Sequence, residues 1–85
     1  MSIDFILPDH IRKISERLLT AIESADSMLQ GVKTGARAEG FVLGLETART
    51  LNQAQIEGLY VLFDEATEQR LKAIADAGLA SITTA

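Results

Sequence analysis

The sequence predicts an all-α domain in which two helices form an antiparallel hairpin and a longer third helix packs closely against them. Apolar residues make up 47% of the 85 residues, which is enough for one modest core. They recur with the three- and four-residue spacing of helices over most of the chain. Residues that start or stop helices divide this pattern into three segments. We therefore expect a single helical domain over residues 1–85.

The N-terminal segment leads into the first predicted helix. Residues 1–7 contain a short apolar run with no second strand to pair with, so we expect an extended arm that lies on a helix of this chain or of a neighbouring subunit. Pro8 suits the first turn of a helix, and Asp9 suits its positive end. The apolar spacing predicts a helix over residues 9–30, with Gly31 as its stop. The apolar positions of this pattern are Ile11, Ile14, Leu18, Ala21, Ile22, Ala25, Met28, Leu29 and Val32.

A short turn is expected next, followed by a second helix over residues 35–50. The turn is Gly-Val-Lys-Thr-Gly at residues 31–35, and Thr34 suits the N-cap of the second helix. A connection this short predicts that the two helices run antiparallel.

The second helix carries four small residues at four-residue spacing, Ala36, Gly40, Gly44 and Ala48, which we call the small-residue strip. A glycine inside a helix costs about 1 kcal/mol relative to alanine, so two of them need a reason. We expect the strip to let another helix approach closely, and we expect leucine at Gly44 to disrupt that packing. The approaching helix would be the first helix, a helix of a second copy or a helix of a partner protein.

Apolar residues surround most of the second helix, because Phe41, Val42 and Leu43 are consecutive. A helix of this kind is buried on several sides. A chain of 85 residues has little protein with which to bury it. We therefore expect a homodimer or a higher homo-oligomer, with a two-fold dimer as the default.

The third helix has the clearest start in the chain. Asn52 as N-cap and Gln55 three residues later form a capping box. The helix is predicted to reach about residue 77, where Gly78 ends it. Residues 79–85 are expected to fray.

Two groups of side chains on the third helix are candidates for function. Tyr60 and Phe63 lie one turn apart and belong either to the core or to a protein interface. Asp64, Glu65 and Glu68 form an acidic cluster. We interpret this cluster as a solvated face, because the Glu-x-x-His motif of di-iron bundles is absent.

Composition and charge argue against several function classes. A net charge of −4 argues against a nucleic-acid binder that neutralises phosphates. The chain has no cysteine and one histidine, so we expect no disulfide, no metal site and no cofactor. No signal peptide and no stretch of about 20 apolar residues appear, so we expect a cytoplasmic protein without membrane contact. His10 beside Asp9 is the one catalytic candidate, and we expect no enzyme, because adjacent residues on a helix do not face each other.

Two binding modes other than protein binding stay open. Lys33, Thr34 and Arg37 would stand at the N-terminus of the second helix, where a phosphate-bearing ligand or nucleotide could bind between subunits, although the P-loop order is absent. A DNA-reading helix-turn-helix over the second and third helices is the less favoured alternative. It needs apolar residues where Gln53 and Gly58 stand, and its recognition helix would be acidic.

We therefore expect a non-enzymatic interaction protein that binds another protein and inhibits or scaffolds it. In size and composition the chain resembles small mobile-element proteins that act against host defences, and no motif carries that likeness. The expected interface residues are Ala36, Gly40, Gly44, Ala48, Tyr60 and Phe63.

Overall fold

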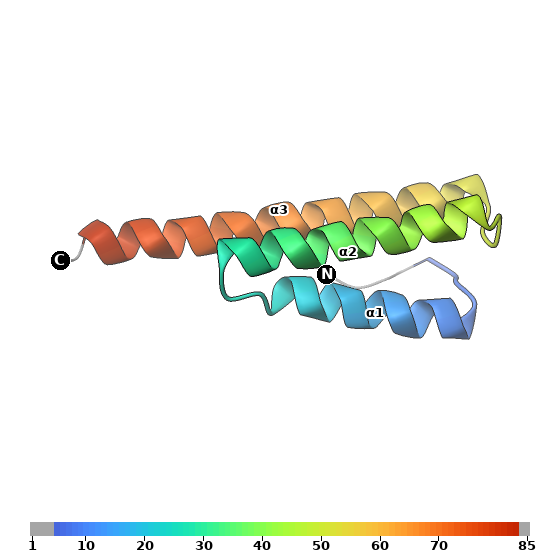
Figure 1. Cartoon of the computed structure of the whole chain (residues 1–85), viewed down its shortest axis with the longest axis horizontal. Coiled ribbons are helices and arrows are strands. Elements are labelled where there is room, and N and C mark those ends of the chain that lie inside the picture. Colours follow the sequence, from blue (N-terminus) through green and yellow to red (C-terminus); the bar gives the residue numbers. More distant parts are fainter. Residues whose placement is uncertain (1–4, 84–85) are drawn as a thin grey trace.

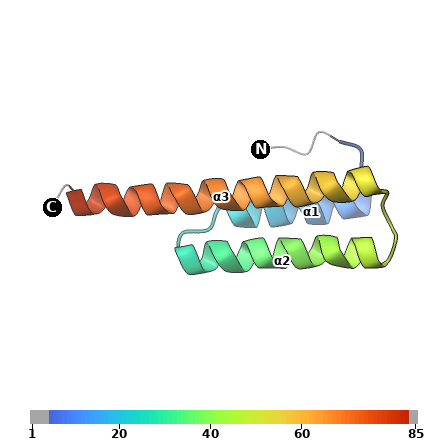
Figure 2. The same ribbon diagram turned by 90° about the horizontal axis from the view of Figure 1, so that it is seen from above.

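Three helices make up the structure, a computed structural model that describes the backbone of residues 5–83 and the side chains of residues 5–78. In chain order they are α1 (Asp9–Glu23), α2 (Met28–Thr47) and α3 (Gln53–Thr83). α2 and α3 run antiparallel and side by side, and α1 packs against both of them (Figure 1, Figure 2). The predicted all-α domain of three helices, with the third helix the longest, is confirmed.

The first turn lies earlier than predicted. It occupies residues 24–27, so the predicted helix over residues 9–30 is too long, and residues 31–35 are helical instead of forming a turn. Thr34 lies inside α2, where its hydroxyl donates a hydrogen bond to the carbonyl of Gln30 at 2.9 Å. Thr34 is therefore not an N-cap.

Ser27 is the residue that starts α2. Its Oγ accepts a hydrogen bond from the backbone N–H of Gln30 at 3.1 Å, and Gln30 Oε1 accepts one from the N–H of Asp26 at 3.2 Å. These bonds satisfy backbone donors that have no partner within the helix. Ser27 and Gln30 have the spacing of a capping box, so the sequence carried a signal for this start.

α2 ends in a Schellman motif that turns the chain toward α3. Arg49 has a φ of 56°, in the left-handed region. Its N–H donates to the carbonyl of Glu46 at 3.1 Å, and the N–H of Thr50 donates to the carbonyl of Leu45 at 3.2 Å. The motif satisfies carbonyls at the end of the helix at the cost of an unfavourable backbone conformation for an arginine.

The predicted start of α3 is confirmed. Asn52 Oδ1 accepts a hydrogen bond from the N–H of Gln55 at 2.8 Å, and Gln55 Oε1 accepts one from the N–H of Asn52 at 2.9 Å. Both bonds of the capping box are therefore present.

The predicted end of α3 is wrong. The helix continues through Gly78 to Thr83, and residues 84–85 of the predicted frayed tail lie outside the described residues. Alanines, the best helix formers, stand on both sides of Gly78 at positions 77 and 80. The last part of α3 extends past the start of α2 (Figure 1, Figure 2).

The core lies where the three helices meet. Two buried side chains among the described residues are polar, Ser15 and Thr34. Ser15 is fully buried, and its Oγ has no hydrogen-bond partner in the described structure. Over the described residues, no helix combines the length and the apolar character needed to span a membrane. The buried apolar residues are Leu7, Ile11, Leu19, Ile22, Ala25, Ala38, Val42, Ile56, Leu59, Phe63 and Ala66.

The described part of the N-terminal arm lies on α3, as expected. The ring of Phe5 lies 3.2 Å from the position that a Cβ would take at Gly58. The side chain of Gln55 donates a hydrogen bond to the carbonyl of Ile6 at 3.0 Å. Residues 1–4 of the predicted arm lie outside the described residues.

Candidate functional site

Two glycines of α2 bring α2 and α3 close together. A Cβ at Gly35 would lie 2.7 Å from Oγ1 and 2.8 Å from Cγ2 of Thr67. A Cβ at Gly31 would lie 2.7 Å from Cδ2 of Leu71. α2 therefore does allow a close helix contact, but the glycines responsible are not those of the small-residue strip.

The small-residue strip faces away from the core. Nothing lies within 4 Å of the Cβ positions at Gly40 and Gly44, and all four residues of the strip are exposed. Gly40 is about two and a half turns from Gly31, which places it on the opposite side of α2. The expectation that the first helix of this chain packs into the strip is wrong. Because a Cβ at Gly44 would have no described atom within 4 Å, leucine there is not expected to disrupt the packing of the three helices.

The sequence held a signal for this orientation. Lys33, Arg37, Gly40 and Gly44 follow one another at intervals of four, three and four residues, so the strip shares its face with two cations. Charged residues gather on the solvent side of an amphipathic helix.

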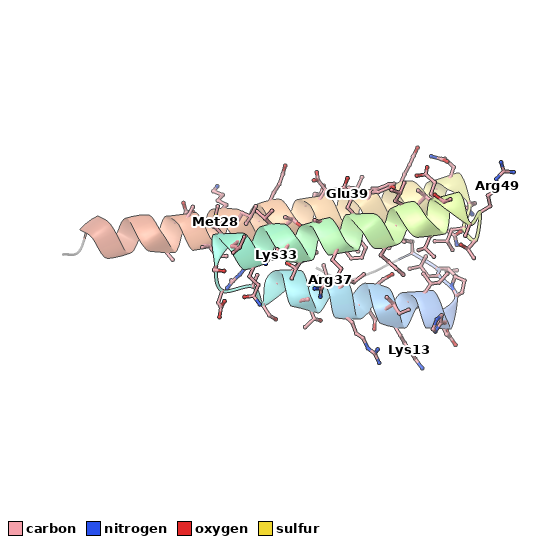
Figure 3. The ribbon with its side chains drawn as sticks, viewed as in Figure 1. Lys13, Met28, Lys33, Arg37, Glu39 and Arg49 are labelled. Atoms are coloured by element: carbon pink, nitrogen blue, oxygen red, sulfur yellow. The ribbon has the colours of Figure 1, made fainter. Side chains whose placement is uncertain are left out.

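A groove with a volume of about 360 Å³ lies between α2 and α3. None of its lining residues comes from α1, and Glu39 projects from α2 on the side away from α1 (Figure 3). The groove exists partly because two of its residues on α2 are glycine and alanine, which leave space that larger side chains would fill. The α2–α3 groove is lined by Val32, Gly35, Ala36 and Glu39 from α2 and by Tyr60, Phe63, Asp64 and Thr67 from α3.

Three of the six predicted interface residues line the α2–α3 groove. They are Ala36, which is exposed, Tyr60, which is half-buried, and Phe63, which is 3% exposed and also belongs to the core. The other three members of the small-residue strip lie outside the groove.

Large apolar side chains are exposed beside the groove. Met28, Val32 and Leu43 of α2 are 47%, 53% and 56% exposed, and Val61 of α3 is 54% exposed. The three α2 residues are separated by four and eleven residues, which keeps them on the groove-lining side of that helix. Val61 lies three residues before Asp64, which lines the groove. Exposed apolar side chains beside a groove are typical of an interaction site.

Carboxylates from both helices lie in and beside the groove. Glu39 and Asp64 line the groove itself. On α2, Glu46 follows Glu39 by seven residues, which is about two turns. On α3, Glu57 lies seven residues before Asp64 and Glu68 lies four residues after it. Helical spacing therefore puts all five carboxylates on the groove side of their helices. Within residues 28–46 of α2 and 57–68 of α3, no Lys or Arg lies at a helical position on the groove side.

Tyr60 connects the two helices at the groove. Its hydroxyl donates a hydrogen bond to Glu46 Oε1 at 3.2 Å. Burial, this hydrogen bond and repulsion from Glu46 and Glu39 all raise the pKa of the Tyr60 phenol. The phenol therefore stays a neutral hydrogen-bond donor in a negative electrostatic environment.

The predicted ligand site at Lys33, Thr34 and Arg37 loses its structural basis. These residues lie inside α2 rather than at a helix N-terminus, so the unpaired N–H groups that would bind an anion are absent there. Thr34 is buried, whereas Lys33 and Arg37 are exposed. Arg37 and Glu39 lie on opposite sides of the α2 ribbon (Figure 3).

The arrangement of the three helices gives little support for DNA binding, for catalysis by His10 or for metal binding. The antiparallel packing of α2 and α3 differs from a helix-turn-helix, whose helices cross at about 90–120° (Figure 1). His10 is exposed in the first turn of α1. Among the described residues, no three His, Cys, Asp or Glu side chains are placed to hold a metal ion.

In comparisons with protein-family models, curated proteins and solved structures, nothing matches this chain.

Proposed function

We propose that this protein is a non-enzymatic binding protein that holds a helix of another protein in the α2–α3 groove and thereby inhibits or scaffolds that protein. The observation that carries the proposal is an open concave surface with exposed apolar side chains beside it. An antiparallel pair of helices has a groove on each side. α1 fills one groove with the buried side chains of Ile11, Leu19 and Ile22, while the lining of the other groove comes from α2 and α3 alone among the described residues.

A helix is the ligand that fits this geometry. Amphipathic helices bind grooves of this kind through side chains at three- and four-residue spacing. The exposed residues Val32, Leu43 and Val61 would each lose roughly half of their surface to such a partner. Full burial of a side chain of this size is worth about 1.5–3 kcal/mol, so each would contribute about 1 kcal/mol toward binding.

Photo-crosslinking tests the proposal directly. A photoreactive amino acid placed at Ala36 in cells that produce the protein should give a discrete crosslinked product, because Ala36 lies in the groove. The matched control is Thr20, which is exposed on α1 and should give no such product. Val61→Asp, on the other helix, should abolish the crosslink from Ala36. Identical products from both positions, or a crosslink that Val61→Asp leaves unchanged, would contradict the proposal.

The homo-oligomer is a second proposal, and a different surface favours it. Gly40 and Gly44 expose bare backbone on the outer face of α2, and Leu29 on that face is 65% exposed. Light scattering decides the matter: a mass of twice the 9.2 kDa chain supports a dimer, and a mass of one chain at high concentration contradicts it.

A further inference from the structure

We propose that the helix bound in the α2–α3 groove is a basic amphipathic helix that carries Lys or Arg beside its apolar residues. This inference rests on the proposed function, because it names the chemistry of the partner that the same groove would select.

The charges beside the groove are of one sign on both helices. α2 contributes Glu39 and Glu46, and α3 contributes Glu57, Asp64 and Glu68. A helix docked in the groove would meet carboxylates from both helices. Cations on both flanks would face carboxylates, whereas acidic flanks would meet like charges, and rim charges of this kind select partners and speed association.

Two of these carboxylates accept hydrogen bonds from uncharged donors. Glu46 accepts from the phenol of Tyr60, and Glu57 accepts from the side-chain amide of Gln53 at 3.4 Å. Both donors are neutral, so neither cancels the negative charge. The raised pKa of Tyr60, to which repulsion from Glu46 and Glu39 contributes after burial and the hydrogen bond, agrees with a negative potential over the groove.

The apolar part of the groove sets the size of the ligand. Ala36 lines it with a small, exposed side chain, which leaves room for a docked helix there. The stripe on α2 runs from Met28 to Glu46, which is about 27 Å at 1.5 Å per residue. A helix of about 18 residues would cover it.

A second copy of this chain fits the groove poorly. A two-fold interface uses the same patch on both subunits. It would place the carboxylates of one groove against those of the other, in two chains that each carry a net charge of −4. The favoured occupant is therefore a basic helix of a different protein.

Selection from a displayed library of helical peptides tests this inference. Every peptide has 18 residues with apolar residues at helical spacing, and each flanking position is randomised among Lys, Glu and Gln. The library is selected against the whole wild-type chain and, separately, against the Glu39→Lys/Asp64→Lys variant. Binding of individual peptides is then measured by fluorescence anisotropy at low and high salt. Ala36→Arg reports whether a peptide uses the groove, and Thr20→Arg on α1 is its matched control. Circular dichroism confirms that each variant is folded.

The expected result is enrichment of Lys on the wild-type chain and of Glu on the charge-reversed variant. The charge reversal should weaken a Lys-flanked peptide roughly tenfold, and Glu39→Gln/Asp64→Asn should weaken it about threefold. Groove-dependent peptides without a charge preference would overturn this inference and leave the proposed function standing. Absence of any peptide that Ala36→Arg weakens would overturn both. A dimer that Ala36→Arg dissociates would show that the occupant is a second copy, which also overturns the inference.

Discussion

For the glycines of α2, we predict that the position of the glycine decides whether alanine raises or lowers the free energy of unfolding. Gly40→Ala and Gly44→Ala add methyl groups where nothing lies within 4 Å, so only helix propensity changes. Alanine is favoured over glycine in a helix interior by about 1 kcal/mol. The double variant should therefore raise the free energy of unfolding by about 2 kcal/mol, or roughly 8–16 °C in Tm for a domain of this size.

Gly35→Ala is the matched comparison, and we expect the opposite behaviour. The same gain in propensity applies, but the new methyl would lie 2.7 Å and 2.8 Å from the two γ atoms of Thr67. Thr67 cannot turn away easily, because it is β-branched and its hydroxyl donates to the carbonyl of Phe63 at 2.7 Å. Overpacking of this kind costs about 1–3 kcal/mol. Since propensity cancels in the difference, Gly35→Ala should be about 1–3 kcal/mol less stable than Gly44→Ala.

Urea denaturation followed by circular dichroism measures both free energies. Equal stability of Gly35→Ala and Gly44→Ala would refute the close contact between α2 and α3. A Gly40→Ala/Gly44→Ala variant that is less stable than the parent, by an amount that depends on protein concentration, would refute the open strip and support an interface there.

Four further perturbations have expected outcomes. Asn52→Ala should lower the free energy of unfolding by about 1 kcal/mol through loss of the capping box, and an unchanged urea midpoint would contradict this. Arg49→Gly should raise it by about 1 kcal/mol, because glycine tolerates the positive φ; a loss of stability would count against the left-handed conformation. Ser15→Ala should raise it by about 1 kcal/mol, and destabilisation would mean that the buried hydroxyl has a partner. Tyr60 is the only tyrosine, and the chain has no tryptophan, so ultraviolet titration follows one phenol. Its pKa should lie above the ordinary 10.0 and fall in Glu46→Gln. The stability linked to this shift is fully present below pH 10.0 and is lost as the pH rises through the folded-state pKa, and a pKa that Glu46→Gln leaves unchanged would contradict the contact.

The sequence predicted the class and the number of helices because both depend on local spacing and composition. The start of α3 was predicted correctly, since Asn52 and Gln55 satisfy each other within four residues. The boundary between α1 and α2 was misplaced because Gly31 resembles a helix stop. In the structure, Gly31 continues the helix and leaves room for Leu71. The two residues are 40 positions apart in the sequence, so no local pattern reveals their contact.

The candidate site was predicted only in part, for a similar reason. α2 has small residues on two opposite faces. Residue spacing identifies both faces, but it does not show which of the two packs on α3. Ala36, Tyr60 and Phe63 were predicted as interface residues; they line the groove, and their binding role stays a proposal. Glu39 and the exposed Val32 were missed, because the groove they line exists only once α2 and α3 are paired.

Nuclear magnetic resonance with a Lys-flanked helical peptide is the most direct measurement of whether the groove binds a partner. Backbone amide signals of Gly35 and Ala36 on α2 and of Thr67 on α3 should move together as the peptide is added, while those of Lys13 and Thr20 on α1 stay in place. Signals that move mainly on α1 would contradict binding in the α2–α3 groove. The same holds if no signal moves at a concentration at which a peptide selected from the library is bound.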